Sequence, residues 1–163
     1  MNDDKRPLPT ISKDNQPFWE ACREGRLVLP HCHRCDQAYW PPSPVCPVCF
    51  AGPPEWRSVS GRGIVSTFVV VHQPWFPAFK SELPYNVAQV ELEEGPRLTT
   101  TIVQLGHEAL AVGLEVEPVF EDNAETLGIL KFRPSTVARL NSKPDCASKK
   151  PEDIQAPVPR QNQ

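Results

Sequence analysis

The sequence predicts a mainly β protein, in which a short N-terminal helix precedes a metal-binding ribbon and a five-stranded barrel. Three observations predict this fold class. The 163 residues include 20 prolines, more than double the average usage, which disfavours long helices. Four of the six cysteines form two Cys-x2-Cys pairs, and several short β-type runs follow them. A chain of this length fits one ordinary domain or two small modules that share a surface.

Composition divides the chain into five segments. Around Phe18 and Trp19 the pattern is that of a short amphipathic helix, with Pro17 suited to its first turn and Gly25 to its end. The C-terminal part is polar and rich in lysine and proline, which is typical of disorder. The predicted segments are a flexible arm (1–14), the N-terminal helix (15–26), the ribbon (27–60), the barrel (61–135) and a largely disordered tail (136–163).

The ribbon contains the strongest chemical signal in the sequence. The spacing Cys32-x2-Cys35-x10-Cys46-x2-Cys49 places two thiolates on each of two tight turns. Four thiolates suit a tetrahedral ion that needs no open coordination position. The sequence therefore predicts a structural metal, whose removal should unfold residues 26–60.

Zinc is favoured over iron at this site, although four thiolates also fit a rubredoxin-like iron centre. His31 and His33 are surplus to a filled coordination sphere and are expected on the ribbon surface. Asp36 and Phe50 occupy the positions after each pair where Gly often stands, which predicts less regular turns.

Five β-type runs after Gly63 predict the barrel. A short helix-forming stretch, 107–111, lies between the third and fourth runs. Five strands with one helix between strands three and four is the OB-fold arrangement. The predicted strands span 64–72, 85–92, 97–103, 115–121 and 127–132.

Charge and hydropathy limit the partners. The net charge is −3, and residues 63–133 carry four Lys or Arg against ten Asp or Glu, so the barrel is the acidic part. A single-strand nucleic-acid binder needs a basic groove with aromatic side chains, so this alternative is disfavoured. No apolar run approaches the ~20 residues that cross a bilayer, and the start lacks a secretory signal. We expect a cytoplasmic protein with no membrane partner and no nucleic-acid partner.

Independent catalysis has little support in the sequence. There is no glycine-rich phosphate loop, no GxSxG elbow and no HExxH helix. His72 and His107 could act as bases, but isolated histidines at element boundaries are more often structural. The pair at 93–94 is interpreted as a solvated hairpin tip. Cys22 and Cys146 have no visible base or cation nearby and are expected to be inert.

Taken in order, these segments resemble the zinc-ribbon OB-fold proteins that are associated with acyl-CoA enzymes. The similarity runs from about residue 15 to about residue 135. It is carried by Phe18–Leu27, the two cysteine pairs separated by Trp40-Pro41-Pro42, Trp56–Gly63, Leu83-Pro84-Tyr85, Val90–Leu98 and Val112-Gly113.

The resemblance implies a non-catalytic accessory subunit in a hetero-oligomer. Members of that family typically assist thiolase-like enzymes or hydratases that act on acyl-CoA, including the retro-aldol cleavage of sterol side chains. The chemistry would then belong to the partner enzyme, and this chain would stabilise it or help to shape its CoA site. A lone rubredoxin-like electron carrier is the remaining alternative, and it would purify as a red iron protein.

Two groups of residues fit that accessory role. Aromatic side chains in the proline-flanked loop and on the helix could anchor a partner, or could simply cover the barrel and the ribbon. Guanidinium and ammonium groups could meet CoA phosphates at a shared acyl-CoA site, although each could equally be a solvated surface charge. The partner-binding candidates are Trp75, Phe76, Phe79, Phe18 and Trp19, and the CoA-binding candidates are Arg34, Arg57, Arg62 and Lys80.

Overall fold

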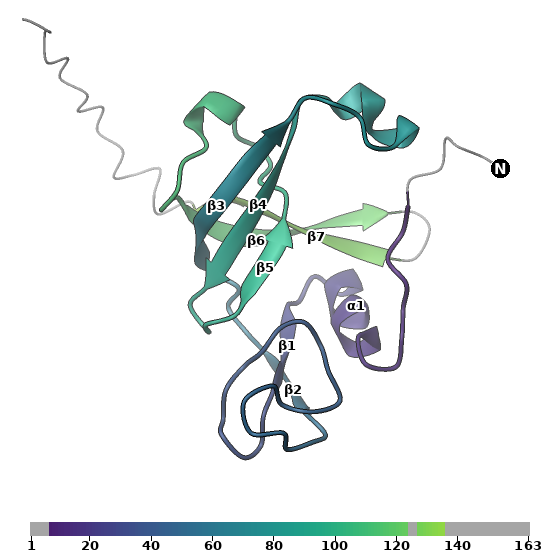
Figure 1. Cartoon of the computed structure of the whole chain (residues 1–163), viewed down its shortest axis with the longest axis vertical. Helices are drawn as coiled ribbons and strands as arrows, with labels where there is room; N and C mark the ends of the chain where they lie inside the picture. Colours follow the sequence, from purple (N-terminus) through teal and green to yellow (C-terminus); the bar gives the residue numbers. More distant parts are fainter. Residues whose placement is uncertain (1–6, 124–126, 136–163) are drawn as a thin grey trace, which may run out of the picture.

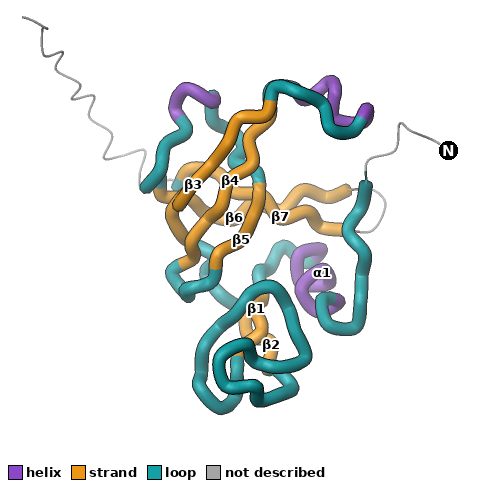
Figure 2. The backbone as a smooth tube through the Cα atoms, viewed as in Figure 1, coloured by secondary structure: helices purple, strands orange, loops and turns teal. Residues whose placement is uncertain are grey.

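The computed structural model describes residues 7–123 and 127–135. Two small sheets and one helix make up the described fold (Figure 1). The barrel sheet occupies one end of the molecule, and the ribbon with its long loops occupies the other (Figure 2). The predicted tail, 136–163, and Cys146 within it lie outside the described residues, as does the beginning of the predicted arm, 1–6.

The N-terminal helix α1 spans Gln16–Arg23, within the predicted segment. Pro17 stands in its first turn, where a missing N–H costs nothing. Asn15 precedes the helix without capping it, because its side chain bonds Ser12 N (2.8 Å) and Thr10 O (3.0 Å). Gly25, with φ of +71°, ends the helix in the left-handed conformation that helix C-termini favour.

The ribbon sheet pairs β1, Val28–His31, with β2, Glu55–Ser58, in antiparallel register. Between these strands the chain forms two cysteine turns and the loops that join them. Residues 38–40 contribute one isolated bridge, between Ala38 and His31. The prolines that follow end this extension at once, because they cannot donate to a ladder.

The barrel sheet has the strand order β5-β4-β3-β6-β7, with antiparallel pairing throughout. Alternate residues of β4 are buried, which is the period-2 pattern of a strand with one face on a core. The five strands are β3 Gly63–Val71, β4 Tyr85–Leu92, β5 Arg97–Thr100, β6 Glu115–Asn123 and β7 Leu127–Pro134.

The sheet curls until β5 approaches β7, giving a nearly closed five-stranded barrel of the OB type. A parallel bridge joins Ile102 to Phe132 just beyond the end of β5. Buried Asn86 supports this closure, since its amide accepts from Ile102 N (2.7 Å) and donates to Ile102 O (2.8 Å). A side-chain amide thus replaces the strand ladder where β5 has ended.

Two short 3₁₀ helices lie in the barrel connections. The stretch 107–111, predicted to form a short helix, is a single turn, η2, over His107–Ala109. The loop between β3 and β4 carries η1 over Pro77–Glu82, which the sequence analysis did not predict. The prediction of a mainly β fold with one N-terminal helix is confirmed. No helix in the described ranges is long and apolar enough to span a membrane.

Candidate functional site

The two cysteine turns have the same backbone geometry. In the first, the N–H of Asp36 donates to Cys32 O (2.9 Å), and in the second the N–H of Phe50 donates to Cys46 O (3.0 Å). The first cysteine of each turn also donates its own N–H to the carbonyl of the turn's last residue. Cys32 donates to Gln37 O, and Cys46 donates to Ala51 O. We call these turns the first knuckle, residues 32–37, and the second knuckle, residues 46–51.

The four thiols converge at one point. Their sulfur atoms all lie within 4.8 Å of one another. Three of the separations are 3.4 Å (Cys32 to Cys49), 3.7 Å (Cys35 to Cys46) and 3.8 Å (Cys35 to Cys49). Four sulfurs bonded tetrahedrally to one ion at ~2.3 Å would be ~3.8 Å apart. The cysteines are therefore positioned to hold a metal ion with every coordination position filled.

Backbone N–H groups prepare the first cysteine of each knuckle to bind as a thiolate. The Sγ of Cys32 accepts from the N–H groups of Arg34 and Cys35, and that of Cys46 accepts from Val48. The N–H of Cys35 lowers the pKa of Cys32 to about 6, and the N–H of Cys49 lowers the pKa of Cys46. Burial instead raises the pKa of Cys35 to about 12, so a bound cation is needed to deprotonate the full set.

The prediction of less regular turns is wrong. Asp36 and Phe50 both adopt left-handed backbone conformations, with φ of +53° and +58°, and both knuckles keep their hydrogen bonds. A left-handed conformation costs a residue other than Gly ~1–2 kcal/mol. The knuckle geometry is thus retained at the expense of local strain.

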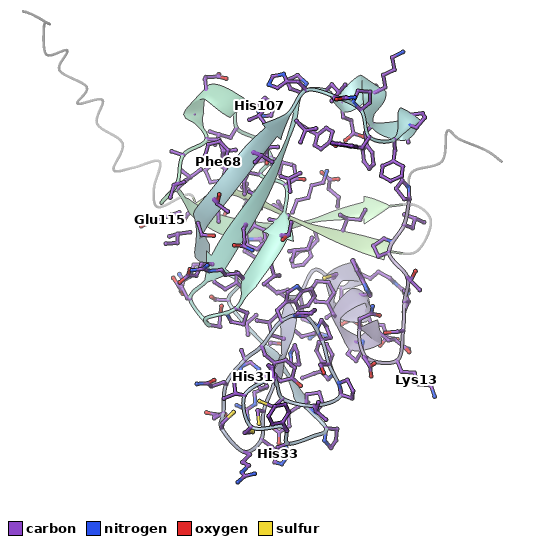
Figure 3. The ribbon with its side chains drawn as sticks, in the orientation of Figure 1. Lys13, His31, His33, Phe68, His107 and Glu115 are labelled. Carbon is purple, nitrogen blue, oxygen red and sulfur yellow. The ribbon has the colours of Figure 1, made fainter. Side chains whose placement is uncertain are left out.

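The histidines lie away from the sulfur cluster. His33 is exposed, and His31 is half-buried with its Nδ1 3.1 Å from Leu29 O. Figure 3 shows both at the ribbon end of the molecule, whereas His107 lies at the far end of the barrel. The only metal-binding cluster among the described residues consists of the four cysteines.

The remaining described cysteine is buried rather than reactive. Cys22 on α1 is 1% exposed, and burial raises its pKa to about 12. Its thiol therefore stays protonated at neutral pH, which supports the prediction that Cys22 is inert.

The loop between β3 and β4 exposes large aromatic side chains. We call residues 73–84 the aromatic loop. Trp75 is 73% exposed and Phe76 is 52% exposed, and η1 has no buried residue. Phe79 is half-buried between the rings of Phe76 (6.2 Å) and Tyr85 (5.9 Å), so it supports the loop from beneath. Two of the three loop candidates are thus free to meet a partner.

The helix candidates are placed differently from the loop candidates. Phe18 is 3% exposed and packs in the barrel core against Trp40, at a ring distance of 4.6 Å. The interpretation of Phe18 as a partner contact is therefore wrong, because α1 uses that face to cover the barrel. Trp19 is half-buried against the same core and is reachable only in part.

The four CoA candidates come from separate parts of the chain. Arg57 is paired with Asp36 (2.5 Å) and Glu55 (2.9 Å), and Arg62 lies 3.6 Å from a carboxylate oxygen of Glu93. Arg34 is exposed on the first knuckle, and Lys80 is exposed on η1 in the aromatic loop. Arg57 thus ties β2 to the first knuckle, because two carboxylates already accept hydrogen bonds from its guanidinium group.

Glu94 has a structural partner that the sequence did not indicate. Its Oε1 accepts from the N–H (2.7 Å) and the hydroxyl (2.8 Å) of Ser60, in the segment that joins β2 to β3. The interpretation of 93–94 as a solvated hairpin tip is therefore wrong for Glu94. This side chain holds the turn between β4 and β5 against the segment that joins β2 to β3.

Of the two candidate bases, one has a structural hydrogen bond and the other is exposed. His107 bonds Pro84 O through Nε2 (2.8 Å), which fixes η2 to the end of the aromatic loop. His72 is exposed just after β3.

The second knuckle is an exposed apolar surface that the sequence analysis missed. Val48 is 62% exposed and Phe50 is 77% exposed. The sequence does carry a sign of this surface, because residues 41–54 include no charged side chain. The first knuckle, by contrast, carries His33, Arg34 and Asp36. Charge depletion beside exposed apolar side chains is typical of interaction surfaces.

Comparison with known proteins gives a consistent family match. Residues 19–55 match the model described as "ChsH2, rubredoxin-like zinc ribbon domain", and residues 56–121 match "ChsH2, C-terminal OB-fold domain". A solved structure described as "Ltp2-ChsH2(DUF35) aldolase" is 35% identical, with a TM-score of 0.71, over 78% of this chain and 98% of that one.

Two relatives extend the comparison. A DUF35 domain-containing scaffold protein of Methanothermobacter thermautotrophicus is 37% identical over 113 residues, which cover 64% of this chain and 84% of that protein. A probable enoyl-CoA hydratase alpha subunit of Thermomonospora curvata is 39% identical over 132 residues, which cover 80% of this chain. The present chain spans only 40% of the length of that hydratase subunit.

Proposed function

Because this chain belongs to the ChsH2 family of zinc-ribbon and OB-fold proteins, we propose that it is a non-catalytic accessory subunit of an enzyme that processes acyl-CoA. The partner would be a thiolase-like enzyme or an acyl-CoA hydratase, in a hetero-oligomer. Names of relatives support this choice, since they include a hydratase alpha subunit, a scaffold protein and an aldolase.

The metal in this proposal is a structural Zn²⁺ held by Cys32, Cys35, Cys46 and Cys49. The sulfur separations fit a tetrahedral thiolate site, and a filled coordination sphere leaves no position for a reacting water. The ion would supply folding energy to the knuckles and no chemistry to the reaction.

The observation that carries the proposal is the exposure of the aromatic loop. Trp75 and Phe76 together present more apolar surface than a solvated connection requires. Phe79 contacts the ring of Phe76 on one side and that of Tyr85 on the other, and the His107 bond to Pro84 O holds the loop's end. Aromatic anchors held by a rigid base suit the centre of an interface, because little conformational entropy is lost on binding.

A shared acyl-CoA site would use the cations that are least engaged by carboxylates. Lys80 stands on the aromatic loop and would approach the partner together with Trp75. Arg57 is the weakest of the four candidates, since Asp36 and Glu55 already occupy its guanidinium. We therefore assign any phosphate contact to Lys80 first and to Arg34 and Arg62 after it.

The first experiment is affinity capture of the full-length chain from its native host, followed by mass spectrometry of the proteins that co-elute. We expect a thiolase-like enzyme or a hydratase, and acyl-CoA conversion by the mixture but not by this chain alone. A chain that converts acyl-CoA by itself, or that retains nucleic acid and no enzyme, would contradict the proposal.

A matched pair of variants then locates the interface. Trp75→Ala with Phe76→Ala should weaken capture of the enzyme by at least tenfold, as expected for interface anchors, and should leave one zinc per chain. Phe50→Ala is the control, because it removes a highly exposed aromatic ring from the second knuckle, and the ribbon lies at the opposite end of the molecule from the loop between β3 and β4 (Figure 1). If only Phe50→Ala lowers capture, the enzyme binds the second knuckle and the aromatic loop is not the interface.

A further inference from the structure

Half of β3 pairs with a strand on one side only. β4 accompanies β3 along its whole length, whereas β6 pairs with it only at its first two residues. The last bonds on that side belong to Val65, whose N–H donates to Leu114 O (2.9 Å) and whose carbonyl accepts from Gly113 N (2.8 Å). Among the described residues, none pairs with 67–71 on the side away from β4. We call residues 67–71 the open edge.

A β-bulge at Ser66 separates the two halves of the strand. The pairing with β4 shifts by one residue between Val65 and Thr67, and the Ser66 hydroxyl donates to Gln89 O (2.9 Å). A bulge bends its strand and increases the local twist. β3 therefore turns away from β6 at this point and continues with β4 alone.

The register shows which backbone groups point outward along the open edge. Phe68 and Val70 stand opposite Ala88 and Asn86 of β4. These two lie an even number of positions from Leu92, whose N–H donates to the residue just before β5 (2.9 Å), so they face β5 as Leu92 does. Their partners on β3 face the other way. The N–H and C=O groups of Phe68 and Val70 thus point away from β4 and have no strand partner.

The open edge lacks the features that protect other edges. It reads Thr-Phe-Val-Val-Val, with no charge and no proline, and Val69 is 58% exposed. Phe68, although it packs against the barrel core, is only half-buried. In the described sheet β6 also has an open side, but Pro118 there has no N–H, and Glu117 and Glu121 carry charge. Natural sheets protect unused edges by such residues, so β3 is the edge suited to take up a further strand.

We propose that the open edge binds an extended segment of the partner enzyme as an added strand of the barrel sheet. This inference rests on the proposed function and adds the mode of binding. The outward groups of Phe68 and Val70 select an extended backbone, as in other complexes formed by strand addition. The bound segment is uncharged and rich in β-branched or aromatic residues, because its side chains lie beside Val69 on one face and Phe68 on the other.

Two observations favour the enzyme over a second copy of this chain. β3 leads directly into the aromatic loop, so one enzyme can meet Trp75 and the open edge as a continuous surface (Figure 1). Residues 63–133 carry four Lys or Arg against ten Asp or Glu, so two barrels placed edge to edge repel each other. An uncharged segment of another protein meets no such repulsion.

The first test compares two substitutions of Val70 in affinity capture from the native host. Val70→Pro removes one outward N–H and leaves the bonds to β4 in place, whereas Val70→Thr keeps the N–H and nearly the same shape. We expect Val70→Pro to lower capture of the enzyme about tenfold, as the loss of one interface hydrogen bond predicts, and Val70→Thr to leave capture unchanged. Both variants should retain one zinc per chain and the thermal unfolding midpoint of the wild-type protein.

The second test needs no variant and so does not depend on how Val70→Pro folds. Hydrogen exchange with residue-level fragmentation compares the free wild-type chain with the captured complex. The amides of Phe68 and Val70 should exchange rapidly in the free chain and at least about tenfold more slowly in the complex. Thr67 and Val69, which already face β4, are the internal controls and should be protected in both states.

The outcomes separate this inference from the proposed function. If no enzyme co-elutes, the proposed function fails and the inference fails with it. If an enzyme co-elutes and Trp75→Ala with Phe76→Ala lowers its capture, but exchange at Phe68 and Val70 does not change, the aromatic loop is the interface and strand addition is wrong. A dimer of the isolated chain that Val70→Pro dissociates, measured by sedimentation, would show that a second copy occupies the edge and would also overturn the proposal.

Discussion

The knuckles and the barrel are stabilised by different means. The barrel core, to which α1 contributes Phe18, contains fully buried side chains such as Phe132 and Val65. The buried cluster of the knuckles consists of Cys32, Tyr39 and Cys46, so two of its three members are candidate metal ligands. A region with so little apolar surface to bury depends on its metal, whereas the barrel depends on burial.

The ribbon contains both the residues that depend on the metal and residues that belong to the barrel's hydrophobic core. Leu27 and Leu29, at the start of the ribbon, belong to the barrel cluster and are 3% and 0% exposed. The knuckles beyond His31 pack around the sulfur cluster with Tyr39 instead, whereas Trp40 and Trp56 return to the barrel cluster. Metal and hydrophobic burial therefore stabilise adjacent parts of one ribbon, and four substitutions can separate their contributions.

The largest effect is expected from Cys46→Ser. Losing one thiolate should release the ion and with it most of the ~10–16 kcal/mol that structural zinc contributes in small domains. Hydrogen exchange should show loss of protection between β1 and β2, while β3 to β7 stay protected. Cys22→Ala is the control and should retain one zinc per chain. If the barrel strands lose protection as well, the two regions form one cooperative unit.

The next effect is expected from Phe132→Ala in the barrel. Phe132 is 0% exposed, and truncation of such a side chain typically costs ~3–5 kcal/mol. Denaturant unfolding followed by intrinsic fluorescence should show this loss, and the folded fraction should still bind one zinc. Val69→Ala, at a position 58% exposed, should change the free energy of unfolding by less than ~0.5 kcal/mol. Loss of zinc from folded Phe132→Ala would show that barrel packing controls the metal site.

A smaller effect is expected from Glu94→Gln at the junction. The amide keeps the shape but weakens the two bonds to Ser60, at a cost of ~1–2 kcal/mol. Glu93→Gln is the control, because the exposed Glu93 makes only a long contact with the Ser60 hydroxyl (3.5 Å) and a 3.6 Å pair with Arg62, and such surface pairs contribute ~0–1 kcal/mol. Thermal unfolding of both variants measures the difference. Equal stabilities would mean that Glu94 does not hold the ribbon to the barrel.

The smallest effect, and the only stabilising one, is expected from Phe50→Gly. Glycine adopts the φ of +58° without a Cβ clash, which stabilises the folded state. Its greater conformational entropy in the unfolded state opposes this effect, and the net increase in the free energy of unfolding is ~0.5–1 kcal/mol. Resistance to a chelator should rise slightly. Val48→Gly in the same knuckle should lower that resistance, because Val48 has no positive φ to relieve. A loss of stability in Phe50→Gly would indicate that the Phe50 ring contributes to the knuckle.

The order of elements and the cysteine site were predictable because both depend on short-range patterns. Two residues between cysteines define a knuckle, and alternating burial defines a strand such as β4. Phe18 and Glu94 were misjudged for the opposite reason. Whether an amphipathic helix faces its own barrel or a partner depends on contacts with residues far along the chain, and the Glu94 to Ser60 bond spans 34 positions.

The sequence by itself determined the mainly β fold and the four cysteines, since spacing and periodicity encode local geometry directly. Its resemblance to known proteins indicated the family. Tertiary structure alone decided which aromatic rings remain exposed, and it buried Phe18 while leaving Trp75 and Phe50 in solvent. It also left the open edge of β3 without a partner strand, because the departure of β6 from β3 is a property of how the barrel closes. Burial is a relation between distant segments, and local pattern does not specify it.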